Sequence, residues 1–178
     1  MAHARELDVV RVFLRDDGTY PNSALPLLHY RLAVPEAATE GAPAFERRYV
    51  SNGYGGSWRN GVFAYHHYHT TTHEVLGVFA GTAKVLFGGD AGTAVTVGAG
   101  DLIVIPAGVA HKALEASGDF SVVAAYPDGR SPDMRWGRAG ERPAADHSIA
   151  AVPIPTTDPI AGPQGPLVRL WGGAPRTR

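Results

Sequence analysis

Apolar residues in the middle of the chain occur in short runs that glycine and proline separate. Between residues 62 and 126 there are seven such runs, each four to eight residues long and rich in β-branched and aromatic residues. Turn-forming segments such as Gly88–Gly89–Asp90 and Pro106–Ala107–Gly108 lie between them. Because runs of this length and composition are typical of β-strands, we predict seven strands here. They cover Val62–His69, Glu74–Ala80, Ala83–Phe87, Ala94–Val97, Asp101–Ile105, His111–Ala116 and Phe120–Tyr126.

The first 60 residues add two extended runs and one helix candidate. Leu7–Leu14 is a predicted strand, and Leu25–Val34 is also apolar, although Pro26 limits it to a sheet edge or an irregular run. The helix candidate lies within Pro43–Ser51 and is short. No stretch of the sequence alternates strands with long amphipathic helices, so the pattern disfavours a doubly wound α/β sheet. The pattern predicts an all-β sandwich or barrel with one or two short helices.

Residues 127–178 differ from the rest because they hold nine of the fourteen prolines. They nevertheless keep large apolar residues, such as Trp136, Leu167 and Trp171, in which a disordered segment would be poor. We therefore predict an ordered, mostly irregular tail packed on the barrel or on a partner subunit; a flexible tail is the alternative. Together with the N-terminal residues 1–60 and the central residues 61–126, this tail completes a single domain, residues 1–178.

The overall composition excludes several classes of function. The net charge of −1 provides no attraction for nucleic acid or anionic lipid, and the absence of cysteine excludes disulfides and thiolate catalysis. Residues 1–10 contain no apolar run of signal-peptide length, and no run elsewhere is long enough to span a bilayer. We therefore expect a cytoplasmic protein without a membrane or nucleic-acid partner.

The candidate chemistry lies in a cluster of histidines, four of which occur within eight residues. His67 and His69 are two residues apart, so in a strand both imidazoles face the same side. Glu74 begins the returning strand opposite them, and His111 begins a later strand after a turn. Three imidazoles and one carboxylate suit one divalent transition metal, namely Fe, Mn, Ni, Cu, Co or Zn. The predicted ligands are His67, His69, Glu74 and His111.

Two other histidines of this cluster have different predicted roles. His66 is out of phase with its neighbours and should point away from the metal. His73 directly precedes Glu74, at a turn where strand alternation can fail. It either supports Glu74 or a neighbouring imidazole through a hydrogen bond, or replaces one of the ligands.

Two segments of the chain resemble the two motifs of the cupin superfamily. The first is Gly61-x5-His67-x-His69-x4-Glu74-x6-Gly81, and the second is Gly100-x5-Pro106-x-Gly108-x2-His111. The second motif usually ends in asparagine, where this chain has Glu115; that departure leaves the metal ligands intact. The resemblance implies a jelly-roll barrel made of two sheets.

A wider resemblance extends beyond the motifs. Segments such as Asp16–Asp17–Gly18, the run from Gly55 to Gly61 and the run from Gly140 to Pro143 are similar to those of the YjlB-like proteins. These are single-domain bacterial cupins without a settled activity, so the resemblance specifies the fold better than the reaction. It also implies a homodimer. The predicted strand Glu74–Ala80 is apolar on both faces, so a second sheet, the tail or a dimer partner must cover its outer side.

These features predict a metal-dependent cupin that acts on a small organic substrate able to chelate the ion. The favoured reaction class is oxygenase chemistry, as in a metal-dependent dioxygenase, with Arg59 and Tyr65 orienting the substrate. Trp58 and Phe63 would add apolar walls to the same pocket. Two alternatives stay open, a redox-neutral isomerase or decarboxylase and a non-catalytic cupin that binds a metal or a small ligand.

Overall fold

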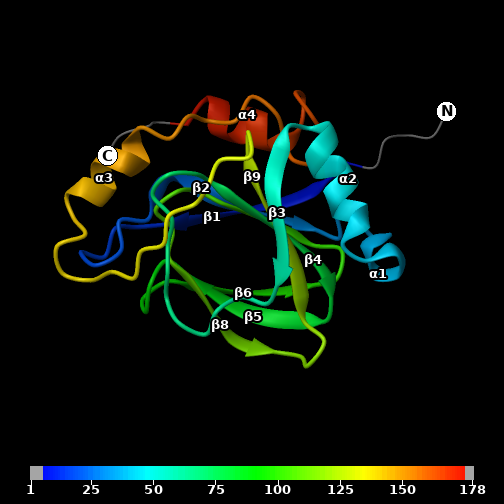
Figure 1. Cartoon of the computed structure of the whole chain (residues 1–178), viewed down its shortest axis with the longest axis horizontal. Helices are drawn as coiled ribbons and strands as arrows, with labels where there is room; N and C mark the ends of the chain where they lie inside the picture. Colours follow the sequence, from blue (N-terminus) through cyan, green and yellow to red (C-terminus); the bar gives the residue numbers. More distant parts are fainter. Residues whose placement is uncertain (1–5, 175–178) are drawn as a thin grey trace.

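The computed structural model describes residues 6–174, which form two antiparallel β-sheets that face each other (Figure 1). The larger sheet has six strands in the order β1-β2-β7-β4-β9-β3, and the smaller has three in the order β6-β5-β8. The strands are β1 (Asp8–Leu14), β2 (Ser23–Arg31), β3 (Tyr54–Asn60), β4 (Glu74–Ala80), β5 (Thr82–Phe87), β6 (Thr93–Gly98), β7 (Leu102–Ile105), β8 (His111–Ala116) and β9 (Ser121–Pro127). The predicted all-β fold class is confirmed.

The central strands of the larger sheet, β4, β7 and β9, are buried on both faces. Side chains alternate between the two faces along each strand. On β4, Leu76 and Val78 point between the two sheets and pack in one apolar cluster with Phe87 of β5. Val75, on the opposite face of β4, belongs to a second cluster outside the sheet. A strand that is apolar on both faces therefore has a separate core on each side.

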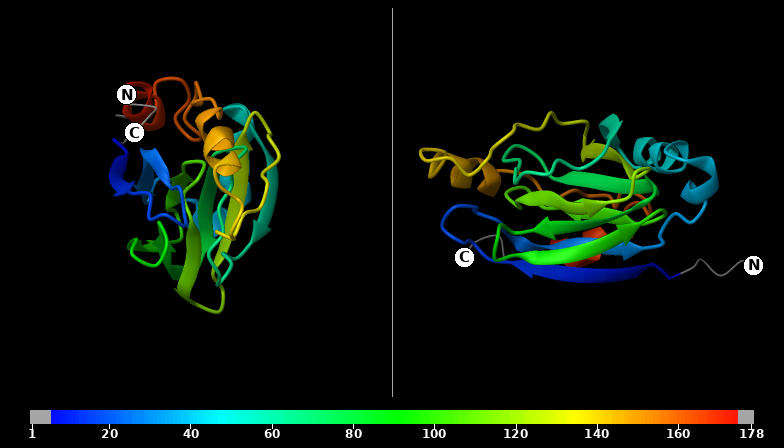
Figure 2. Two further views of the ribbon diagram at one scale, coloured as in Figure 1. Left: turned by 90° about the vertical axis from the view of Figure 1, so that its left-hand side faces the viewer. Right: turned by 90° about the horizontal axis from the view of Figure 1, so that it is seen from below.

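The described residues also form four short helices, α1 (Ala37–Glu40), α2 (Pro43–Ser51), α3 (Ala144–Ala150) and α4 (Pro166–Gly172). Three of them, α1, α2 and α4, cover the outer side of the larger sheet, whereas α3 packs separately against Tyr68 and Ala110 (Figures 1 and 2). Phe45 of α2 and Leu167 of α4 are fully buried in the outer cluster. Only α2 is predicted from the sequence, because the four to seven residues of the other helices are too few to give a helical period.

The C-terminal tail is attached to the sheet by Trp171. This residue is fully buried, and its indole Nε1–H donates a hydrogen bond of 2.9 Å to the carbonyl oxygen of Pro26 in β2. The outer face of β4 is thus covered by this chain's own helices, so the double apolarity of that strand no longer argues for a dimer partner. The homodimer itself stays a prediction. Among the described residues, no helix has both the length and the apolar character that a bilayer crossing needs.

The prediction of a regular strand at Val62–His69 is wrong. The regular strand in this region is β3, which ends at Asn60, and only isolated bridges involve His67 and Tyr68. The carbonyl oxygen of Phe63 accepts a hydrogen bond from Ala113, and His67 pairs with His111. The five residues from Phe63 to His67 therefore lie opposite only three residues, from Ala113 to His111. The extra residues form an outward bulge at positions 64 and 65.

Candidate metal centre

The backbone brings His67 and His111 directly opposite each other. The amide of His67 donates to the carbonyl oxygen of His111 at 3.2 Å, and the amide of His111 donates back at 2.9 Å. Residues in such an antiparallel pair place their side chains on the same face. The centroids of the two imidazole rings are consequently 4.1 Å apart, although the chain between them forms four strands, β4 to β7.

His69 is held by two neighbouring segments. Its carbonyl oxygen accepts a hydrogen bond of 2.8 Å from Gly108, in the turn before β8. Gly108 has φ +93°, and a Cβ atom there would lie 2.3 Å from the carbonyl oxygen of Asn22, so only glycine fits. On the other side, Asp133 of the tail accepts hydrogen bonds from the backbone and the hydroxyl of Thr70, at 2.6 and 2.7 Å. Both contacts fix the position of His69.

All three imidazoles use Nδ1 for a contact with a backbone carbonyl oxygen. His67 contacts Tyr65 at 3.3 Å, His111 contacts Val109 at 3.1 Å, and His69 contacts Asp133. A carbonyl oxygen can only accept a hydrogen bond, so Nδ1 carries the proton in each ring. The lone pair is then on Nε2, which is the arrangement that a metal-binding histidine requires.

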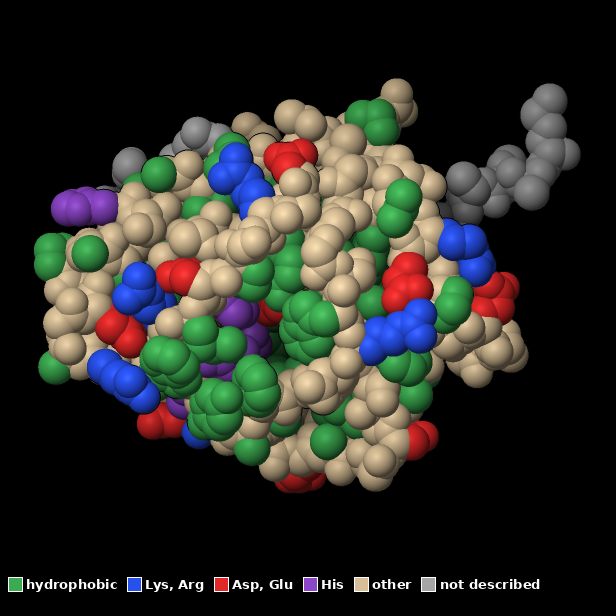
Figure 3. Space-filling model, in the orientation of Figure 1, with side chains coloured by type: hydrophobic (Ala, Val, Ile, Leu, Met, Phe, Trp, Pro, Cys, Tyr) green, Lys and Arg blue, Asp and Glu red, His purple; other side chains and the backbone are tan. Residues whose placement is uncertain are grey.

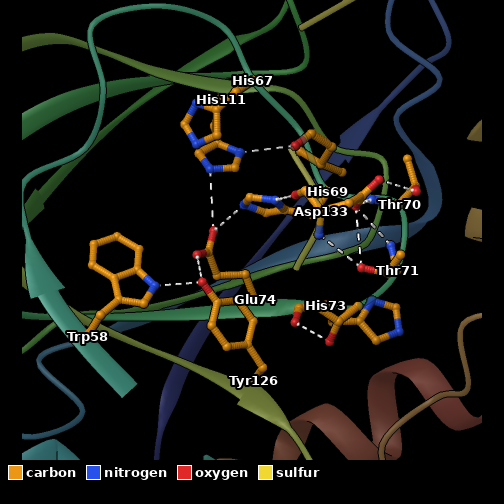
Figure 4. A network of polar contacts seen from close by, with 12 residues as sticks. Trp58, His67, His69, Thr70, Thr71, His73, Glu74, His111, Tyr126 and Asp133 are labelled. Carbon is orange, nitrogen blue, oxygen red and sulfur yellow. Dashed lines mark hydrogen bonds and ion pairs between the residues drawn. The ribbon is translucent and has the colours of Figure 1, made fainter. Parts of the chain in front are cut away.

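Glu74 completes the cluster from the start of β4 (Figure 4). Its Oε2 lies 3.4 Å from Nε2 of His69 and 3.4 Å from Nε2 of His111. Its other oxygen, Oε1, accepts a hydrogen bond of 2.9 Å from the Tyr126 hydroxyl. The Tyr126 oxygen in turn accepts one of 2.6 Å from the indole Nε1–H of Trp58. This chain of bonds orients the carboxylate so that one oxygen faces the imidazoles.

The charge states of these groups follow from burial and from their mutual contacts. Burial, together with the neighbouring His111, lowers the pKa of His67 to about 3. Burial also favours the neutral form of His69, but the adjacent Glu74 carboxylate outweighs it and raises the pKa of His69. Burial by itself would raise the pKa of Glu74, yet the contacts with His111 and His69 hold that pKa well below its usual range. Glu74 is therefore an anion and His67 a neutral base near neutral pH.

The donor set fits a transition-metal ion. The ligand nitrogens of His67, His69 and His111 all lie within 4.8 Å of one another, and all three residues are buried. Two ligand atoms that are each about 2.1 Å from one ion are about 3.0–4.2 Å apart. The 3.4 Å distances to Glu74 fall in this range. Three nitrogens around one ion cannot all lie opposite one another, so in an octahedral or tetrahedral set they would be about 3.0–3.4 Å apart. The imidazoles would therefore have to approach one another by up to about 1–2 Å to share an ion.

A cavity of about 400 Å³ opens from the cluster to the surface (Figure 3). The figure shows histidine side chains at the bottom of a recess whose edge carries apolar side chains. Its lining combines the polar cluster with a largely apolar wall. The lining residues are Trp58, Arg59, Asn60, Gly61, Val62, Phe63, His67, His69, Glu74, Leu76, His111, Tyr126, Pro132, Asp133 and Met134.

The two residues predicted to orient a substrate occupy different places. Arg59 lines the cavity, but its guanidinium forms two hydrogen bonds of 2.7 Å with Glu46, which raise its pKa further. Tyr65 is not among the lining residues; its ring is 49% exposed and stacks on Phe63, with ring centroids 4.9 Å apart. The outward bend at residues 64 and 65 explains why Phe63 lines the cavity while Tyr65 does not. Their roles in substrate binding stay predictions.

The other two histidines of the cluster point away from the ligands. Nε2 of His66 lies 3.0 Å from a carboxylate oxygen of Asp90, as expected for a residue out of phase with His67. Nδ1 of His73 accepts a hydrogen bond of 2.9 Å from the backbone of Ala107, and its ring packs 4.8 Å from that of Trp171. The expected supporting role of His73 is filled by other residues, since Glu74 is oriented by Tyr126.

The chain also resembles proteins that are already known. Residues 59–126 match the family described as the cupin domain. The chain is 41% identical to the uncharacterized protein YjlB of Bacillus subtilis (strain 168) over 167 residues, which cover 93% of this chain and 98% of that protein. This chain belongs to the cupin family. The motif resemblance, the YjlB-like resemblance and the two-sheet fold of a cupin are thereby confirmed.

Solved structures also share similarity with this cupin, at lower levels of identity. Procruciferin, an 11S globulin from Brassica napus, is 17% identical with a TM-score of 0.37; the match covers 64% of this chain and 23% of that chain. The DMSP lyase DddQ from Ruegeria pomeroyi DSS-3 is 14% identical with a TM-score of 0.36; the match covers 73% of this chain and 51% of that chain.

Proposed function

We propose that this cupin is a metal-dependent enzyme whose ion is held by His67, His69, Glu74 and His111. The observation that carries the proposal is the common orientation of the three imidazoles. Each uses Nδ1 for a backbone carbonyl oxygen and leaves Nε2 for an ion, while Tyr126 fixes the fourth ligand.

A catalytic role is supported by the cavity, because it borders all four proposed ligands. A purely structural site would be closed by protein on every side. When bound, the metal supplies Lewis acidity and, if redox active, access to dioxygen chemistry. The protein itself buries the four side chains at the bottom of the cavity and keeps Glu74 ionised through His69 and His111.

We further propose oxygenase chemistry on a small chelating substrate in the cytoplasm. A redox-neutral isomerase or decarboxylase needs a protein group that moves a proton. Apart from the four proposed ligands, the titratable lining residues are Arg59, Tyr126 and Asp133, and each is already hydrogen-bonded to Glu46, Glu74 or Thr70. The pocket therefore offers no uncommitted general base, which favours chemistry that begins with metal activation of the substrate.

Metal analysis tests the ligand assignment. We expect about one equivalent of a divalent transition metal in protein purified without a polyhistidine tag. His67→Ala and His111→Ala should each lose most of it, because three ligands remain of four. His147→Ala is the matched control, since His147 is exposed on α3. Full metal content in both site variants would refute the assignment.

Oxygen consumption tests the reaction class. The Fe(II)-loaded protein would be screened in an oxygen electrode against small carboxylic acids, diols and hydroxyketones that chelate iron. Substrate-dependent oxygen uptake supports the oxygenase. Product formed equally well without oxygen would instead support an isomerase or decarboxylase, and stabilisation by a compound that is never converted would support a binding protein.

A further inference from the structure

The cavity above the metal cluster is divided into a polar floor and an apolar wall. The floor is formed by the three imidazoles, Glu74 and the Tyr126 hydroxyl. The wall contains the side chains of Trp58, Val62, Phe63, Leu76, Pro132 and Met134. Such a division orients a ligand whose polar end faces the floor while the rest of it contacts apolar side chains.

Large aromatic side chains stand exposed around the mouth of this cavity. Trp58 is 36% exposed, Phe63 is 41% exposed, and Tyr65, which stacks on the outer side of Phe63, is 49% exposed. The two stacked rings are nearly parallel, with an angle of 12° between their planes. Exposing aromatic surface to water is unfavourable, and clusters of it on a soluble protein mark binding grooves. Figure 3 shows this apolar edge around the recess.

The wall offers no unpaired positive charge. Arg59 is the only lysine or arginine among the lining residues, and its guanidinium is occupied by both carboxylate oxygens of Glu46. Asp133 is likewise engaged, by Thr70 and by Arg135 at 2.9 Å. A substrate with a phosphate or a second carboxylate away from the metal would find no partner here.

We propose that the substrate is a planar, apolar molecule of aromatic size whose only strongly polar group is a pair of adjacent oxygen donors. The donors face the metal cluster, and the ring lies against Phe63 and Trp58. The volume of about 400 Å³ accommodates a ring system of one or two rings. This inference rests on the proposed metal site and adds the class of substrate to it.

Two hydroxamates with the same chelating group test the inference. Benzohydroxamate carries a phenyl ring where acetohydroxamate carries a methyl group. We expect the metal-loaded protein to bind benzohydroxamate at least about tenfold more tightly, because burying the ring removes apolar surface from water. Calorimetric titration gives both affinities, and the metal-free protein serves as the blank.

Phe63→Ala should reduce this preference to about threefold or less by removing the ring contact; both affinities are measured on protein loaded to the same metal content. Phe13→Ala is the matched control, because Phe13 is 66% exposed on β1 and does not line the cavity. Equal affinities for the two hydroxamates, or a preference that survives in Phe63→Ala, would overturn the substrate class alone. A wild-type protein that binds no metal would overturn the proposed function as well.

Discussion

The Tyr126 hydroxyl donates a hydrogen bond of 2.9 Å to Oε1 of Glu74, and Oε2 of that carboxylate faces His69 and His111. Tyr126 is thus a positioning residue for the proposed fourth ligand. The two residues meet because β4 and β9 are neighbours in the larger sheet, where Val75 pairs with Ala125. Burial and the negative charge of Glu74 both raise the pKa of Tyr126, so its hydroxyl stays protonated and can donate.

Tyr126→Phe removes this donor while it keeps the ring. We expect the affinity for the metal to fall about tenfold, since lost supporting contacts to ligands typically cost that much. Competition with a chromophoric chelator measures the affinity. Tyr65→Phe is the control, because Tyr65 is exposed and does not contact Glu74. Unchanged affinity in Tyr126→Phe would show that Glu74 is not a ligand or does not need this bond.

Asp133→Ala tests whether the tail positions His69. The Asp133 carboxylate accepts hydrogen bonds from Thr70, and these bonds outweigh burial and lower its pKa, so it remains charged near neutral pH. Without the carboxylate, the backbone carbonyl of Asp133 that accepts the Nδ1–H of His69 would no longer be held in position. We expect a metal affinity about tenfold lower and a free energy of unfolding about 1–2 kcal/mol smaller.

Chelator competition and urea unfolding measure the two effects of Asp133→Ala. Asp8→Ala is the matched control, since Asp8 is an exposed residue at the start of β1. A variant that lost stability but retained full metal affinity would show that the tail supports the fold without positioning His69.

Much of the fold can be predicted because its signals are local. The bounds of Glu74–Ala80 and His111–Ala116 follow from short apolar runs between turn residues, and the structure has the same bounds. The bulge at residues 64 and 65 has no such signal. It depends on how Phe63 and His67 pair with β8, which only the assembled sandwich determines.

The site divides in the same way. The three histidines that converge can be predicted: His67 and His69 from their spacing in one segment, and His111 from the second motif. Their supporting residues are not, because Tyr126 contacts Glu74 across 52 positions and Trp58 contacts Tyr126 across 68. The order of strands would have revealed the first contact, since it places the start of β4 beside the end of β9. Asp133 contacts His69 through its backbone carbonyl, for which residue type gives no indication, and its carboxylate holds that carbonyl in place through Thr70.

Trp171→Ala tests the attachment of the tail. The indole is fully buried and donates a hydrogen bond to Pro26, and its ring contacts that of His73. Replacing a buried tryptophan by alanine typically reduces the free energy of unfolding by about 3–5 kcal/mol. Urea unfolding measures the loss, and Trp136→Ala, at a residue 39% exposed, should cost far less. Similar losses in the two variants would show that the tail contributes little to the core.

The stability of the metal-free protein should fall as the pH is lowered below 6.5. Burial lowers the pKa of His67 to about 3 and that of His73 to about 4, from an ordinary value of 6.5. Between pH 6.5 and about 4, the unfolded chain therefore binds protons at these two positions that the folded chain does not. Each lowers the free energy of unfolding by up to about 1.4 kcal/mol per pH unit.

His69 does not cancel this dependence. Its raised pKa contributes stability that is fully present below pH 6.5 and is lost only as the pH rises through the folded-state pKa. In the acidic window its contribution is constant. The slope comes from His67 and His73. His66 and, toward pH 4, Glu74 add contributions of the same sign, because their pKa values are also lowered. Urea unfolding in the presence of a chelator at several pH values measures that slope. His73→Asn should reduce it by the contribution of one proton, whereas His147→Asn, at an exposed position, should leave it unchanged. Equal stability at pH 5 and pH 7 would contradict the prediction. It would show that burial does not keep the two imidazoles from binding protons in the folded state.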